Sequence, residues 1–194
     1  MEQPLFVFFF FFLVLVSSCW SWNVPEFCLG KQCPVFKTVN SQPLFEERQY
    51  EATDWISTRA EARSREAFLR ARSTLDSYCT EHANVKVATD TWPVLAIATG
   101  EEDSGEQFLC WFIDPDQTIP ENTPPQIPVR HVPTSTVYVR TFNGLPSLEN
   151  FEKNAAELRK ALRNAGRAFD EQTYGVAAYG FLTNLKQEIW IWAV

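Results

Sequence analysis

Apolar and polar residues follow two periodic patterns along the chain after its N-terminal stretch. Alternation at every second position is typical of a strand with two different faces, and apolar residues repeated every three or four positions are typical of an amphipathic helix. The clearest strand is Val137–Phe142, in which Val and Thr alternate with Tyr, Arg and Phe. Asn143 and Gly144 follow, and because both tolerate positive φ, the strand is expected to end there.

A helix is expected directly after this strand, over Ser147–Ala165. Pro146 and Ser147 indicate its start, and Gly166 is a natural C-terminal cap. Apolar residues recur at steps of three and four and form one stripe: Leu148, Phe151, Ala155, Leu158, Leu162 and Ala165.

The first half of the chain predicts strands on both sides of another helix. The strands are expected at Val35–Val39, Leu44–Tyr50, Trp55–Ala60, Trp92–Thr99 and Phe108–Ile113. Trp55–Ala60 is rich in β-branched and aromatic residues, which favour strands. The helix is expected over Ser64–His82, with a stripe made of Phe68, Ala71, Leu75, Tyr78 or Cys79, and His82. Both faces of Phe108–Ile113 are apolar, as expected for a strand between a barrel interior and a covering helix.

The segment Asp114–Pro128 separates two halves of similar element order. It contains five prolines, which exclude regular structure. The second half then predicts its helix and strands at Val129–Val132, Val137–Phe142, Tyr174–Tyr179 and Gln187–Trp192. With the first strand, Val35–Val39, left aside, each half reads strand, strand, helix, strand, strand. Two such ββαββ units predict an α+β fold, in which a distorted antiparallel β-barrel is flanked by two helices.

Four motifs carry a resemblance to a known family. They are VYVRTFNG, AAELRKALRNAG, FEERQYEATDWIST and the closing EIWIW. In this order they resemble the SOUL, or heme-binding protein, family, over roughly Pro25 to Trp192. The resemblance implies the same flanked barrel, and heme or another tetrapyrrole as ligand.

The N-terminal segment has the pattern of a secretory signal. Leu5–Val16 is an unbroken apolar run, shorter than the roughly 20 residues that span a bilayer, and small residues follow it. We expect a signal peptide over residues 1–19, cleaved after Cys19 or Ser21, a secreted domain over 24–194, and no stable membrane span after cleavage. Glu2 without any Lys or Arg is unusual at a signal's start. A membrane-tethered N-terminus and a lipoprotein box with lipidated Cys19 stay open as alternatives.

Cleavage after Cys19 leaves four cysteines, Cys28, Cys33, Cys79 and Cys110. An even number in a secreted chain suggests disulfides, and four cysteines allow three pairings. We favour Cys28–Cys33 with Cys79–Cys110; the alternatives join the N-terminal segment to the body.

The formal net charge of −7 argues against non-specific nucleic-acid binding, because a phosphate-neutralising surface is not available. The chain has two histidines, His82 and His131. This makes a zinc site or a catalytic triad improbable in sequence terms, so we expect no catalytic residue and no dedicated metal site. Each histidine is a weak candidate for an axial iron ligand, and the family includes members that hold heme without an obvious histidine.

Two surfaces are candidates for tetrapyrrole contact. On the first helix, Leu69 lies one turn from Arg65 and Arg72, away from the apolar stripe, and arginines suit the carboxylate chains of a porphyrin. A solvated helix face is the competing interpretation. The family places the second contact on the hairpin Tyr179–Lys186, where Phe181 and Leu182 are apolar within a turn. Tyr179, Phe181 and Leu182 are expected to cover the ring, and Lys186 to add a second charge.

These features favour a secreted, non-catalytic binding protein for heme or a related tetrapyrrole. One alternative is an extracellular interaction or signalling protein that uses the same fold without a tetrapyrrole, its partner unknown. A further alternative is an enzyme acting on a small molecule in the barrel groove, for which Glu188 and Tyr174 are the groups to check.

Overall fold

A computed structural model describes residues 22–82, 91–100, 106–117, 122–180 and 185–194. The expected signal peptide and the candidates Phe181 and Leu182 lie outside the described residues.

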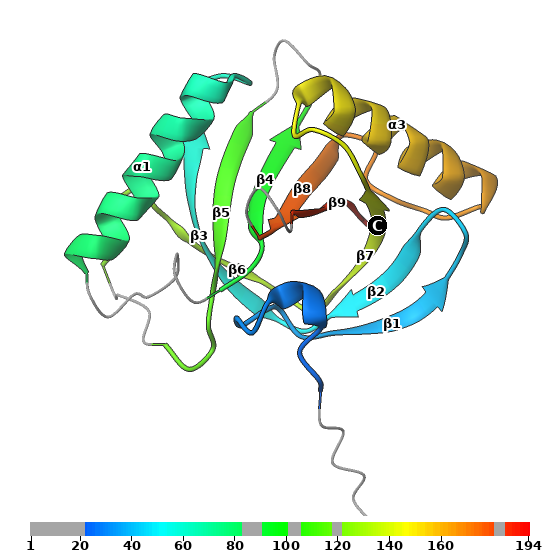
Figure 1. The fold of residues 1–194 in the computed structure, drawn as a ribbon, viewed down its shortest axis with the longest axis horizontal. Helices are drawn as coiled ribbons and strands as arrows, with labels where there is room; N and C mark the ends of the chain where they lie inside the picture. Colours follow the sequence, from blue (N-terminus) through cyan, green and yellow to red (C-terminus); the bar gives the residue numbers. More distant parts are fainter. Residues whose placement is uncertain (1–21, 83–90, 101–105, 118–121, 181–184) are drawn as a thin grey trace, which may run out of the picture.

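The elements match the expected order closely (Figure 1). A short 3₁₀ helix, η1 (Glu26–Cys28), precedes the first strand. The two long helices are α1 (Arg65–Glu81) and α3 (Leu148–Asn164). The strands are β1 (Phe36–Ser41), β2 (Glu46–Tyr50), β3 (Thr53–Ala60), β4 (Val94–Thr99), β5 (Gln107–Ile113), β6 (Val129–Val132), β7 (Ser135–Phe142), β8 (Thr173–Tyr179) and β9 (Lys186–Trp192).

The strands form one antiparallel sheet in the order β1-β2-β7-β9-β8-β4-β5-β3-β6. The strand order is consistent with two related halves, because β2, β3, β4 and β5 occupy places equivalent to those of β6, β7, β8 and β9. One strand of each half pairs with a strand of the other half: β2 pairs with β7, and β6 pairs with β3. The first half carries one extra strand, β1, at the edge of the sheet.

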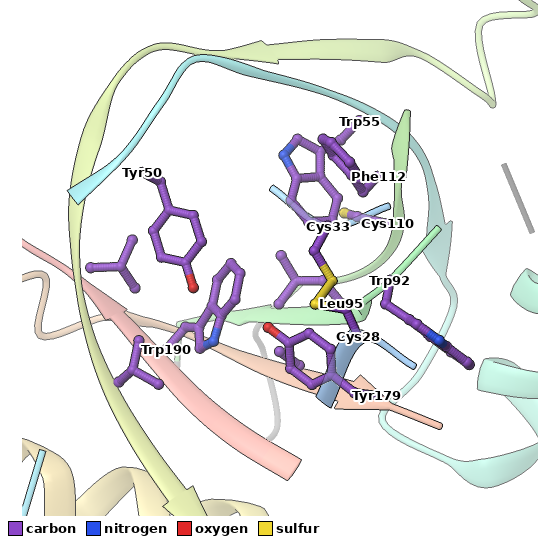
Figure 2. Packing of buried hydrophobic residues seen from close by; sticks show 13 residues of the cluster. Cys28, Cys33, Tyr50, Trp55, Trp92, Leu95, Cys110, Phe112, Tyr179 and Trp190 are labelled. Carbon is purple, nitrogen blue, oxygen red and sulfur yellow. A yellow bond between two sulfur atoms is a disulfide. The ribbon is translucent and has the colours of Figure 1, made fainter. Parts of the chain in front are cut away.

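The sheet curls into a partial barrel, and both helices lie on its convex side (Figure 1). α1 packs on β3 and β5, and α3 packs on β7 and β9. The concave side is lined by aromatic and apolar residues (Figure 2). β5 shows the division, because Leu109, Trp111 and Ile113 belong to the core under α1, while Cys110 and Phe112 belong to the concave core. The expectation that both faces of this strand are apolar is therefore confirmed.

Local signals explain where the helices start and stop. The hydroxyl oxygens of Ser64 and Ser147 accept hydrogen bonds from the backbone N–H groups three residues later, at 3.1 and 3.2 Å. Gly166 ends α3 at a φ of 63°, and the N–H of Arg167 donates to the carbonyl of Leu162. This arrangement is a Schellman motif, which requires the left-handed backbone that glycine adopts easily. Of the helices that the structure describes, none is long and apolar enough to cross a membrane.

The segment before β1 packs against the concave core and is closed by the disulfide Cys28–Cys33 (Figure 2). This pairing confirms the first expected disulfide. The second expectation, Cys79–Cys110, is wrong, because both thiols are free and buried. Cys79 lies in the core between α1 and the sheet, and Cys110 lies in the concave core. The sheet itself separates the two sulfur atoms, so no disulfide can form without moving the backbone.

Candidate functional site

The outward side of α1 presents the residues that the sequence singled out. Arg65, Leu69 and Arg72 are exposed, and Leu69 keeps 49% of its surface accessible. Their spacing of four and three residues puts them on one stripe of the helix. Arg72 is weakly engaged, with its Nε 3.7 Å from a carboxylate oxygen of Asp76. We call this stripe the α1 face.

The α1 face suits a tetrapyrrole in its chemistry. An exposed leucine offers apolar contact to a flat ring, and the arginines on either side offer planar donor groups to carboxylate chains. The two arginines are seven positions apart, about 10 Å along a helix axis. The face is an open surface, so it would cover one side of a ring rather than enclose it.

Of the hairpin candidates, the structure describes Tyr179 and Lys186, and it brings neither to this face. Tyr179 is 2% exposed, and its ring lies in the concave core, whereas α1 covers the convex side. The ends of the sheet differ as well. α1 begins just after the C-terminal end of β3, which lies beside the C-terminal end of β4. Tyr179 lies at the other end of these strands, beside the N-terminal end of β4. Lys186, which pairs with Tyr179 across β8 and β9, forms an ion pair with the buried carboxylate of Glu188.

Neither histidine lies beside the α1 face. His82 caps the end of α1, thirteen residues after Leu69, which is roughly 20 Å along the helix. Its Nδ1 lies 3.0 Å from the carbonyl oxygen of Tyr78, and the two rings stack. His131 is on β6, with Nδ1 2.8 Å from a carboxylate oxygen of Asp54. Both histidines therefore already have partners.

A second polar centre lies inside the curled sheet around Glu188, which is 0% exposed. The guanidinium of Arg48 donates to both carboxylate oxygens, at 3.1 and 3.2 Å. The ammonium of Lys186 lies 2.9 Å from one oxygen. The indole N–H of Trp190 and the hydroxyl of Tyr179 donate to the other, at 3.0 and 3.2 Å. We call this group the Glu188 cluster.

The electrostatics of the Glu188 cluster favour an ionised, fully engaged carboxylate. Burial alone would raise the pKa of Glu188, but the charges of Arg48 and Lys186 and the hydrogen bonds outweigh burial, so this pKa lies below its usual value. Burial and the neighbouring carboxylate raise the pKa of Tyr179 well above its usual range. A carboxylate with this many donors is poorly suited to accept a proton from a substrate.

Sequence reasoning identified Glu188 as a group to check but missed Arg48. Arg48 follows two glutamates in β2, which makes the strand resemble a solvent-facing edge. The available signal was alternation, because Arg48 shares a strand face with the aromatic residue Tyr50. Tyr174, the other group to check, belongs to the core under α3 on the convex side and does not reach the Glu188 cluster.

Comparisons with known proteins agree with the fold and the motifs. The model of the SOUL heme-binding protein family matches residues 31–192. Human heme-binding protein 2 is 24% identical over 181 residues, which cover 88% of this chain and 83% of that protein.

Solved structures share the fold at much lower identity. The C-terminal domain of EcmrR superposes with a TM-score of 0.57 at 11% identity, over 82% of this chain and 99% of that domain. A hydrolase from Listeria innocua superposes with a TM-score of 0.54 at 10% identity, over 80% of this chain and 94% of that one. Family membership supports heme or tetrapyrrole binding in general. The family model covers most of the chain, so the chain belongs to the SOUL heme-binding protein family.

Proposed function

We propose that this protein is a secreted, non-catalytic binding protein for heme or a related tetrapyrrole, and that the α1 face carries the ligand. The observation that supports this site is Leu69, which stays 49% exposed between Arg65 and Arg72. An amphipathic helix ordinarily keeps leucine on its buried side. A leucine on the outward side, flanked by two cations, matches an apolar disc with carboxylate chains.

Two further observations support the secreted and non-catalytic parts of the proposal. The signal-like leader and the Cys28–Cys33 disulfide both fit an oxidising compartment outside the cytosol. Glu188, the buried carboxylate in the interior, is held by cations and hydrogen-bond donors and is not available as a base. Binding without turnover therefore fits the residues better than catalysis does.

A hemin titration with matched charge variants tests the site. The variant Arg65→Glu/Arg72→Glu reverses both cations of the α1 face. The control Lys153→Glu/Lys160→Glu makes the same change in charge on exposed residues of α3, also seven positions apart. Hemin binding is followed through the Soret band at constant ionic strength.

We expect saturable binding by the unmodified protein and the control, and at least tenfold weaker binding by the α1 variant, since each lost charge-assisted bond is a large part of a shallow contact. Leu69→Asp should weaken binding in the same direction. Equal affinity of the α1 variant and the control would remove the ligand from the α1 face. Absence of saturable binding by the unmodified protein would contradict the tetrapyrrole proposal itself.

A further inference from the structure

The concave side of the sheet contains a pocket that is separate from the α1 face. It has about 50 Å³ of free volume, and its wall is almost wholly apolar. Several aromatic side chains contribute to this wall, among them Tyr50, Trp55, Trp190 and Trp192. A cavity of roughly 10–15 Å³ on this measure already has room for one water, but such a wall offers water few hydrogen-bond partners. An apolar group that enters the pocket would therefore displace only water that makes few hydrogen bonds there.

One arginine lies at the rim of this pocket. Arg130 on β6 donates from Nε to the hydroxyl of Ser57 at 3.1 Å, and its guanidinium lies 4.5 Å from the centre of the Phe108 ring. These two contacts fix the plane of the guanidinium and leave its two terminal nitrogens for another acceptor. Within the described part of the chain, no carboxylate forms an ion pair with Arg130. The pocket thus combines an apolar wall with one oriented cation.

The charges around the pocket favour an anion over a cation. Among the described residues that line it, none is acidic. Cys110 lines the wall, and burial raises the pKa of its thiol to about 12, so the thiol is uncharged at neutral pH. Glu188 lies on β9 near Trp190, but its charge is balanced by Arg48 and Lys186. A cation in the pocket would meet Arg130 without a free carboxylate to compensate it.

Gly175 on β8 leaves space for two of the side chains that line the pocket. A methyl group at Gly175 would lie 2.9 Å from a terminal carbon of Leu95 and 3.0 Å from the ring of Trp192. Both of these residues line the pocket. A side chain at position 175 would therefore push the wall inward and reduce the free volume.

We propose that this pocket, which is open to solvent on the side of Arg130, binds a small monocarboxylate with an apolar, preferably aromatic, body. One edge of that body inserts among the tryptophans, while the carboxylate pairs with Arg130 at the rim. The site lies on the concave side of the sheet, so the proposal stands independently of tetrapyrrole binding on α1. Hemin titration and the experiment below therefore succeed or fail separately.

Three ligands of similar shape distinguish the charge that the pocket accepts. Phenylacetate carries the carboxylate, phenylacetamide is its neutral counterpart, and phenethylamine is the cation. Each is titrated into the full chain by calorimetry, with tryptophan fluorescence as a second readout. We expect phenylacetate to bind at least tenfold more tightly than the amide, and the amine to bind least.

Two variants test the two parts of the site. Arg130→Gln removes the cation from an exposed position and should lower phenylacetate affinity to that of the amide, while amide affinity stays unchanged. Gly175→Ala should weaken both ligands by a similar factor. Lys160→Gln, an exposed cation on α3, is the matched control and should change neither. Thermal melting confirms that each variant is folded.

Three results would overturn the proposal. The first is no saturable binding of phenylacetate. The second is equal affinity for phenylacetate before and after Arg130→Gln. The third is preference for the amine, which would make the pocket a site for cations. Because Arg130→Gln changes only an exposed side chain, the test remains decisive even if Gly175→Ala fails to fold.

Discussion

Arg48 and Glu188 place two opposite charges inside the curled sheet, where each would be costly alone. Arg48 is 2% exposed and Glu188 is 0% exposed. The pair is supported on both sides, because Glu46 also binds Arg48 and Lys186 also binds Glu188. Desolvation of such a pair can cancel its attraction, so the pair itself adds little net stability. Removing one partner is different, since the other charge stays buried without its main counterion.

We therefore expect Arg48→Ala to lower the free energy of unfolding by about 3 kcal/mol or more. Arg59→Ala is the control, because Arg59 is mostly exposed and its pair with Glu106 is 3.3 Å long at the surface. The control should change stability by less than about 0.5 kcal/mol. Urea unfolding at neutral pH measures both. A loss below about 1 kcal/mol for Arg48→Ala would show that water reaches the interior.

The lowered pKa of Glu188 also predicts an acid dependence of stability. A carboxylate whose folded pKa lies below its unfolded value contributes stability that is present above the unfolded pKa and lost as pH falls through the folded pKa. Unfolding free energy should therefore decrease as pH falls below the ordinary glutamate value of 4.5. The decrease should be shallower in Glu188→Gln. Some slope should remain, because hydrogen bonds outweigh burial at Asp170 and lower its pKa as well.

This acid dependence is measured by denaturant unfolding at a series of pH values, comparing slopes rather than absolute stabilities. The pKa values of Arg48, Tyr50 and Tyr179 are all raised, so Arg48 stays protonated and both tyrosines stay neutral across this range, and none of the three contributes to the slope. Identical slopes for the unmodified chain and Glu188→Gln would contradict the lowered pKa.

At the scale of single elements, the two long helices begin in the same way, with a serine N-cap. Ser64 and Ser147 each cap a helix start through a hydroxyl oxygen. Replacing either serine by alanine should cost about 1 kcal/mol, because one backbone N–H in the first turn of the helix loses its acceptor. Ser147→Asp should retain most of the stability, since a carboxylate also accepts this hydrogen bond and favours the helix start. Thermal unfolding of the four proteins measures the effect, and a stable Ser147→Ala would argue that packing alone sets the start of α3.

These caps explain why the helices were predictable from sequence. The expected helices Ser64–His82 and Ser147–Ala165 differ from α1 and α3 only by their cap residues. The signals are local, since a capping serine and an apolar stripe lie within one segment for each helix, and a glycine follows α3. Strand pairing was less accessible, because the exchange of β2 and β6 between halves depends on contacts far apart in sequence.

The same distinction of local and distant signals applies to the candidate sites. The exposure of Leu69 follows from helix periodicity and was expected. The burial of Tyr179 was not, because its position in a hairpin suggested a surface, while its environment comes from the N-terminal segment and from β2. Cys79 and Cys110 were expected to pair because they were the two cysteines left over. Only the three-dimensional sheet shows that they lie on opposite sides.

At the scale of the whole molecule, the curled sheet separates two proposed ligand surfaces. The α1 face lies outside the convex side, and the pocket beside Arg130 lies on the concave side. α1 and β5 form a packed layer between them, with Leu75 and Leu109 buried in it. Two ligands on these surfaces cannot touch, so competition between them would require a change in the sheet.

We therefore expect hemin and phenylacetate to bind at the same time. Saturation with phenylacetate should change the hemin dissociation constant by less than about twofold, because sites without shared contacts or a shared conformational change have little coupling free energy. The reciprocal titration must give the same factor. Sodium chloride at equal ionic strength is the control, since screening alone weakens a carboxylate–arginine contact at the surface. A large loss of hemin affinity with phenylacetate but not with chloride would show that both ligands use one site. In that case Arg130→Gln and Arg65→Glu/Arg72→Glu, compared side by side, would identify which surface it is.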